Sequence, residues 1–95
     1  MTMPHPGEIL REEFLKPFGL SAHKLATDLR VPATRINDIT RERRGVSADT
    51  ALRLARYFDT TPVFWMNLQS LYDLEVAEAK RGNEIRQYVK TLDAA

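Results

Sequence analysis

Side chains that can read the edge of a DNA base pair stand close together at Ala33, Thr34, Asn37 and Asp38. The Asn37 amide could pair with adenine, and the Asp38 carboxylate could accept from a cytosine amino group. A thymine methyl group could rest on Ala33 or Thr34. Each such pairing carries ~1–3 kcal/mol of discrimination against the wrong base, so these four positions predict direct base readout.

Side chains suited to phosphate groups flank these positions on both sides. In chain order they are Ser21, His23, Lys24, Arg35, Arg41, Arg43 and Arg44. The stretch 21–58 holds eight basic and four acidic side chains, whereas the whole chain has a net charge of only +1. A local basic excess is typical of a nucleic-acid-binding surface. We therefore expect contacts to the backbone of double-stranded DNA, with an affinity that falls steeply with salt.

Other kinds of chemistry find little support in the composition. The 95 residues include no cysteine, which excludes disulfides, thiolate metal sites and a cysteine nucleophile. His5 and His23 are too few and too far apart for a metal site, and no nucleophile-base pair or glycine-rich phosphate loop is present. We expect no catalysis, cofactor or metal. A signal-peptide core and a run of ~18 apolar residues are also missing, so we expect a cytoplasmic protein without a membrane partner.

Apolar residues recur at three- and four-residue steps almost throughout, and no window alternates as a strand would, which predicts an all-α fold. Caps, prolines and glycines mark five helices. They are expected from Pro6 to about Lys16, over about 22–29, from Pro32 until Gly45, from Ser47 through Phe58, and from Thr61-Pro62 onward. The aromatic side chains of Phe64, Trp65 and Tyr72 lie at helical spacing in the fifth helix and are expected in the core rather than on a partner surface.

Gly82 is expected to interrupt the fifth helix. We therefore predict a helix-turn-helix domain over residues 1–82 and a helical C-terminal extension over 83–95. A single small domain supplies only a modest core, so association would help its stability. The leftover apolar residues Ile85 and Val89 indicate a homodimer held by the long fifth helix and the extension, with two DNA half-sites about one helical turn apart.

Residues 21–42 have the spacing of a helix-turn-helix, because only a few residues join two short amphipathic helices. Leu25, Ala26 and Leu29 of the helix over about 22–29 can pack against Ile36 and Ile39 of the helix that begins at Pro32. The second helix of such a unit lies in the major groove, while the first lies across the phosphates.

The segment LATDLRVPATRINDI resembles the helix-turn-helix of the phage-repressor-like XRE family. The flanking segments HPGEILREEFLKPFGLS and ADTALRLARYFDTTPVFWMNLQSLYDL closely resemble HigA-type, or VapI-like, antitoxins over about residues 5–75. Arg30 departs from the family, which usually has glycine in the turn, often at positive φ. A side chain there costs on the order of 1 kcal/mol.

The resemblance implies an antitoxin of a type II toxin-antitoxin system. Such a protein binds a HigB-like mRNA interferase toxin and represses its own operon as a dimer. The resemblance also implies a basic toxin encoded by a neighbouring reading frame. For the toxin contact, the first helix around Ile9 to Phe14 is the candidate surface.

Two alternatives stay open. One is a stand-alone XRE-type repressor without a toxin, which is weakened because the helices leave no room for a ligand-sensing domain. The other is a protein-interaction module that has lost DNA binding, which is weakened by five arginines within residues 30–44.

Overall fold

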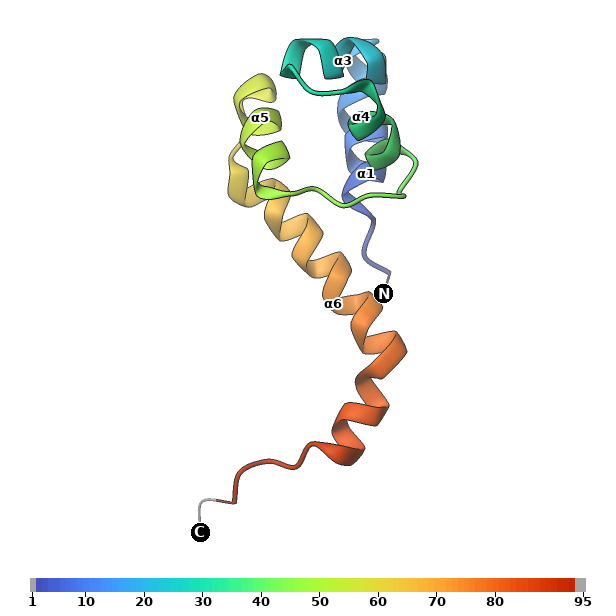
Figure 1. Ribbon diagram of the computed structural model, residues 1–95, viewed down its shortest axis with the longest axis vertical. Coiled ribbons are helices and arrows are strands. Elements are labelled where there is room, and N and C mark those ends of the chain that lie inside the picture. Colours follow the sequence, from blue (N-terminus) through green and yellow to red (C-terminus); the bar gives the residue numbers. More distant parts are fainter. Residues whose placement is uncertain (1, 94–95) are drawn as a thin grey trace.

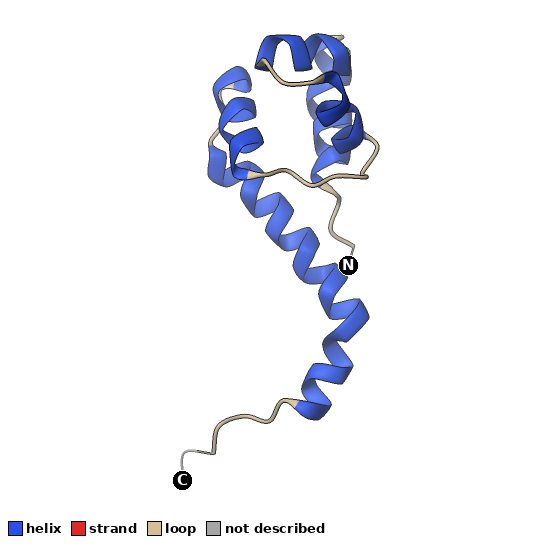
Figure 2. Cartoon of the chain, in the orientation of Figure 1, coloured by secondary structure: helices blue, strands red, loops and turns tan. Residues whose placement is uncertain are grey.

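The computed structural model describes residues 2–93 and consists of helices joined by short turns (Figures 1 and 2). The first helix is continuous and comprises α1 (Pro6–Ile9), the π-helical turn η1 (Leu10–Leu15) and α2 (Lys16–Phe18). It is followed by α3 (Ala22–Leu29), α4 (Ala33–Thr40), α5 (Ala48–Phe58) and α6 (Pro62–Tyr88). The predicted all-α architecture of five helices is confirmed for the described residues.

Polar side chains start four of the five helices. Each accepts a hydrogen bond from a backbone N–H of the first turn, which has no partner within the helix. The caps are His5, Ser21, Ser47 and Thr61, at 2.9, 3.0, 3.3 and 3.1 Å from the nitrogens of Gly7, Lys24, Thr50 and Phe64. Burial lowers the pKa of His5, which keeps the imidazole neutral and its Nδ1 able to accept.

A residue with a left-handed backbone follows the end of each of the first four helices. Gly19, Arg30, Glu42 and Asp59 have φ near +60°, and only the first is a glycine. After α4, the N–H of Glu42 donates to Ile39 and that of Arg43 to Asp38, at 2.9 and 2.8 Å, which closes the helix. The prediction that this helix continues to Gly45 is therefore wrong, because the chain turns at Glu42.

Two further helix boundaries also differ from the prediction. The first helix passes through Pro17 and ends at Phe18, because the π-helical turn before it shifts the bonding and Lys16 donates to Arg11. Gly82 does not interrupt α6, which continues to Tyr88. The ion pair between Glu78 and Arg86 spans Gly82, and the Glu78 carboxyl group lies where a Cβ would stand.

Of the predicted C-terminal extension, residues up to Tyr88 are helical, residues 89–93 are not, and residues 94 and 95 lie outside the described part of the chain. None of the helices within residues 2–93 is both long and apolar enough to cross a bilayer.

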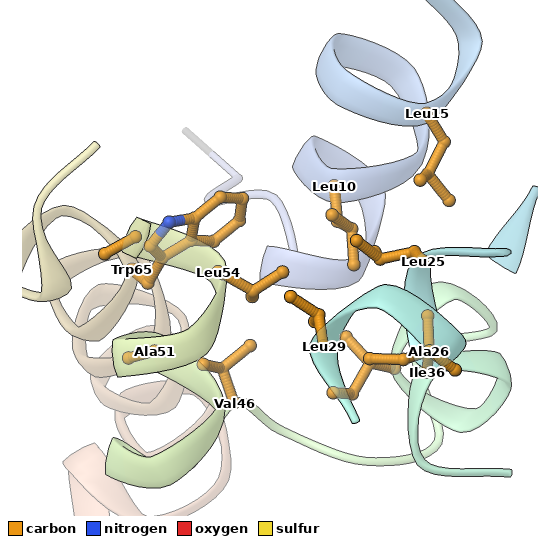
Figure 3. Packing of buried hydrophobic residues seen from close by; sticks show 12 residues of the cluster. Leu10, Leu15, Leu25, Ala26, Leu29, Ile36, Val46, Ala51, Leu54 and Trp65 are labelled. Atoms are coloured by element: carbon orange, nitrogen blue, oxygen red, sulfur yellow. The ribbon is translucent and has the colours of Figure 1, made fainter. Parts of the chain in front are cut away.

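The core lies where the first helix, α3, α4 and α5 meet the start of α6 (Figure 3). Its fully buried large side chains are Leu10, Leu25, Ile36, Ile39, Leu54 and Trp65. The Trp65 indole donates to Thr60 Oγ1 at 2.8 Å, so its N–H is satisfied. Its predicted place in the core is confirmed. Tyr72 is half-buried against His5, and the core prediction for Phe64 is wrong because 38% of its surface is exposed.

The second half of α6 extends away from the other helices (Figure 1). The molecule measures 57 by 23 by 22 Å along its principal axes. The first half of α6 packs on α5 and α1. The second half, residues 76–88, forms an arm on which Ile85 and Tyr88 are exposed. Within the described residues, nothing in the chain covers that arm.

Candidate DNA interface

The pair α3 and α4 is locked by its apolar faces. Leu25, Ala26 and Leu29 of α3 and Ile36 and Ile39 of α4 are all buried in one cluster. The small side chain of Ala26 permits a close crossing of the two helices. The intervening turn closes through Val31, whose N–H donates to the Ala26 carbonyl at 3.0 Å, with Arg30 in the left-handed region at φ 60°. Arg30 therefore adopts the left-handed conformation despite its side chain.

The four predicted base-reading residues lie together on the outer side of α4. Thr34 is exposed, while Ala33, Asn37 and Asp38 are half-buried. Positions three and four apart share one face of a helix, so Thr34, Asn37 and Asp38 project together on the side away from the buried isoleucines, while Ala33 lies at the edge of that face and packs against the core. The polar face presented by α4 is therefore continuous.

The predicted phosphate-binding residues form two groups at the edges of this face. Ser21, His23 and Lys24 are exposed at the start of α3, where the helix dipole favours an anion. Arg41, Arg43 and Arg44 are exposed in the turn after α4, and Arg44 lies 3.9 Å from the Asp38 carboxylate. Lys24 donates to Asp28 at 3.0 Å, so the group before α4 holds one ion-paired cation, whereas the group after α4 holds three guanidinium groups.

Arg35 has a different neighbour, since its guanidinium donates to Asp49 of α5 at 2.7 Å. Asp49 also accepts from Arg53 at 2.9 Å. The bonds from Arg53 and then from Arg35 hold the pKa of Asp49 below its usual range. This network ties the N-terminal half of α4 to α5.

Two residues that support the interface were missed by the sequence reasoning. Arg53 donates to the Leu29 carbonyl at 2.7 Å and so holds the turn between α3 and α4. Arg11 donates to the Thr40 carbonyl and to Glu42 at the other end of α4. The spacing of Asp49 and Arg53 suggests a helical ion pair, but no local pattern signals that either arginine reaches a backbone carbonyl more than twenty residues away.

The first helix also touches α4 directly. A Cβ on Gly7 would stand 1.7 Å from the Ile39 carbonyl oxygen, so only glycine permits this approach. The C-terminal end of α4 is thus fixed by backbone contact as well as by the Arg11 side chain. Within residues 2–93, no three histidine, aspartate or glutamate side chains gather closely enough to hold a metal ion.

A family model described as helix-turn-helix matches residues 12–65, which include α3, α4 and α5. The chain belongs to the helix-turn-helix family. Among its relatives, virulence-associated protein I of Dichelobacter nodosus is 64% identical over 78 residues, which are 82% of this chain and 72% of that protein.

Solved structures of antitoxins from this helix-turn-helix family have the same fold. Antitoxin HigA of Pseudomonas aeruginosa, solved with the higBA promoter, is 54% identical with a TM-score of 0.94, and the match covers 96% of this chain and 99% of that one. Antitoxin GraA in complex with its operator is 55% identical with a TM-score of 0.93, over 99% of this chain and 95% of that one. The predicted resemblance to HigA-type antitoxins is confirmed.

The left-handed turn at Arg30 generates a prediction about stability. Replacing Arg30 by glycine removes the steric cost of a Cβ at φ 60°, and we expect the free energy of unfolding to rise by up to about 1 kcal/mol. Urea titration followed by circular dichroism measures this change. Arg30→Ala is the matched control, because it removes the same charge but keeps the Cβ. Equal stability of the two variants would contradict the steric explanation.

Proposed function

We propose that this helix-turn-helix protein is a sequence-specific DNA-binding antitoxin that binds the operator of its own operon as a homodimer, represses that operon and neutralises a HigB-like mRNA interferase toxin. The observation that carries the proposal is the polar face of α4, flanked by two basic groups and held rigidly by the core. The operator-bound GraA and the promoter-bound HigA support it, since both share this fold at more than half sequence identity. Its place of action would be the cytoplasm.

In this proposal α4 enters the major groove. Asn37 and Asp38 hydrogen-bond base edges, and Ala33 and Thr34 meet thymine methyl groups. Phosphates on one side bind Ser21, His23 and Lys24, and those on the other bind Arg41, Arg43 and Arg44. Arg35 can join the phosphate contacts by exchanging its bond to Asp49 for one to DNA.

Substitutions in the two kinds of position should have different effects on DNA binding. Asn37→Ala should weaken binding to the preferred operator about tenfold and abolish the preference for one base at one operator position, because only the pairing with a base edge is removed. Arg43→Ala should weaken binding to all sequences and lower the slope of log affinity against log salt by about 0.9 per half-site. Gel-shift titrations test both, using a duplex from upstream of this chain's own reading frame. Unchanged affinity in both variants would refute the assignment of α4.

The homodimer would be held by an exposed apolar stripe along α6. Leu71, Leu74, Ile85 and Tyr88 are exposed, and their spacing places them on one stripe of the helix. A second copy is a suitable partner, since a two-fold axis near this stripe would present two α4 helices to two half-sites. In this view residues 1–82 form the DNA-binding domain, and residues 83–95 complete the contact between copies.

A charge placed on this stripe should separate the dimer. We expect Ile85→Asp to sediment as a monomer at tens of micromolar, where the wild-type protein is a dimer, because a carboxylate would be buried without a partner. Asn83→Asp is the matched control, since it adds the same charge on the opposite side of α6. A monomeric wild-type protein, or equal dimerisation of both variants, would argue against this interface.

The toxin contact is assigned to the first helix. Ile9 and Phe14 are half-buried there, while Glu8 and Glu13 are exposed beside them, so the outer side of this helix is acidic. An acidic surface complements the basic toxin that the family resemblance implies. In this assignment DNA and toxin would use different helices.

Co-expression with the product of the neighbouring reading frame tests the antitoxin role. We expect the two proteins to co-purify, and Glu8→Lys/Glu13→Lys to reduce the yield of the complex because the charge complementarity is reversed. The matched control is Glu84→Lys, an exposed reversal on α6. Operator binding without any co-purification would instead favour a stand-alone repressor.

A further inference from the structure

The segment between α4 and α5 carries three of the proposed phosphate contacts but forms no helix. It runs over residues 41–47 and includes Arg41, Arg43 and Arg44. Among the described residues, Arg43 has no side-chain hydrogen bond or ion pair, and Arg44 has only the 3.9 Å contact with Asp38. The direction of both guanidinium groups therefore depends on how the backbone of the segment is held.

The far end of this segment is held by α6. The Oε1 atom of Gln69 accepts a hydrogen bond from the backbone nitrogen of Val46 at 2.6 Å. The Nε2 atom of Gln69 donates to the Asp73 carboxylate, one turn further along α6, at 2.9 Å. Because Asp73 can only accept, it fixes the orientation of the amide and directs the oxygen of Gln69 to Val46.

Two features of the segment fit this bond closely. The side chain of Val46 is buried in the core, so its backbone N–H would be costly to leave without a partner. A Cβ on Gly45 would come within 2.8 to 2.9 Å of the Gln69 amide atoms, so glycine allows the amide to lie directly against the backbone. Val46 is thus fixed two residues after Arg44 by its side chain and by its N–H.

We propose that Gln69 is a positioning residue for DNA binding, which holds residues 41–47 so that Arg43 and Arg44 are already aligned with phosphates before DNA arrives. The inference rests on the proposed function. A segment held in its bound form loses less conformational entropy on binding and so binds more tightly. Gln69 itself lies on α6 and would not touch DNA.

Three variants test this role against a merely structural one. Gln69→Leu removes the acceptor at similar size. Gln69→Glu keeps an acceptor but places a second carboxylate beside Asp73. The double variant Gln69→Glu/Asp73→Asn supplies a donor at position 73 again and should restore the bond to Val46. Gln87→Leu, at an exposed position of α6, is the control for the removal of a glutamine.

DNA affinity is measured as a function of salt concentration, at a temperature well below the unfolding temperature of each variant. Two duplexes are used, one of random sequence and one from upstream of the chain's own reading frame. We expect Gln69→Leu to bind both duplexes about tenfold more weakly. We also expect its salt slope to fall by about 0.9 for each phosphate that the arginines no longer neutralise. Gln69→Glu should show part of this effect, and the double variant should recover. In hydrogen exchange, the Val46 amide should be protected in the wild type and lose protection in Gln69→Leu.

An unchanged salt slope in Gln69→Leu, with only a lower unfolding temperature, would overturn the positioning role. If that variant does not fold, the other two decide the matter, since equal binding by Gln69→Glu and the double variant would overturn it as well. A wild-type chain that binds neither duplex would refute the proposed function and this role together. Wild-type binding with no effect of Gln69→Leu would refute the role of Gln69 alone.

Discussion

Burial of Ile36 and Ile39 is the interaction on which the rest of the structure depends. Helix α4 has only eight residues and no side-chain cap, so it would not persist alone in water. Both isoleucines are fully buried, and this packing fixes α4 against α3 and the first helix. The polar face of α4 is rigid because its apolar face is part of the core. The proposed base readout would in this sense be a consequence of the packing beneath it.

The helices, most of their caps and the buried faces could be predicted from the sequence, because hydrophobic spacing and capping chemistry are local. The end of α4 could not, since a left-handed glutamate rather than Gly45 closes it. The continuation of α6 through Gly82 could not be predicted either, and the ion pair between Glu78 and Arg86 spans the glycine there. The residues proposed to contact DNA were also chosen from the sequence, and the structure places them on α4, at the start of α3 and in the turn after α4. The residues that hold this surface, Arg11 and Arg53, were not, because their partners are distant backbone carbonyls.

The first helix, α5 and α6 each hold a part of the candidate interface in place. The first helix holds the end of α4 through Gly7 and Arg11, and α5 holds its start through Asp49. Helix α6 reaches the segment after α4 through Gln69. The surfaces proposed for the toxin and for the second copy therefore lie on the same helices that orient the residues proposed to bind DNA.

The arm of α6 has ion pairs on its surface in place of packing against other helices. The ion pairs Glu78 to Arg86 and Arg81 to Glu84 lie on its exposed turns, and Gly82 between them contributes no side-chain packing of its own. Exposed pairs of this kind weaken as mobile ions screen them. Under the proposed function, rising ionic strength would thus act on this protein twice, because it would weaken both the attraction to phosphates and the ion pairs of the arm.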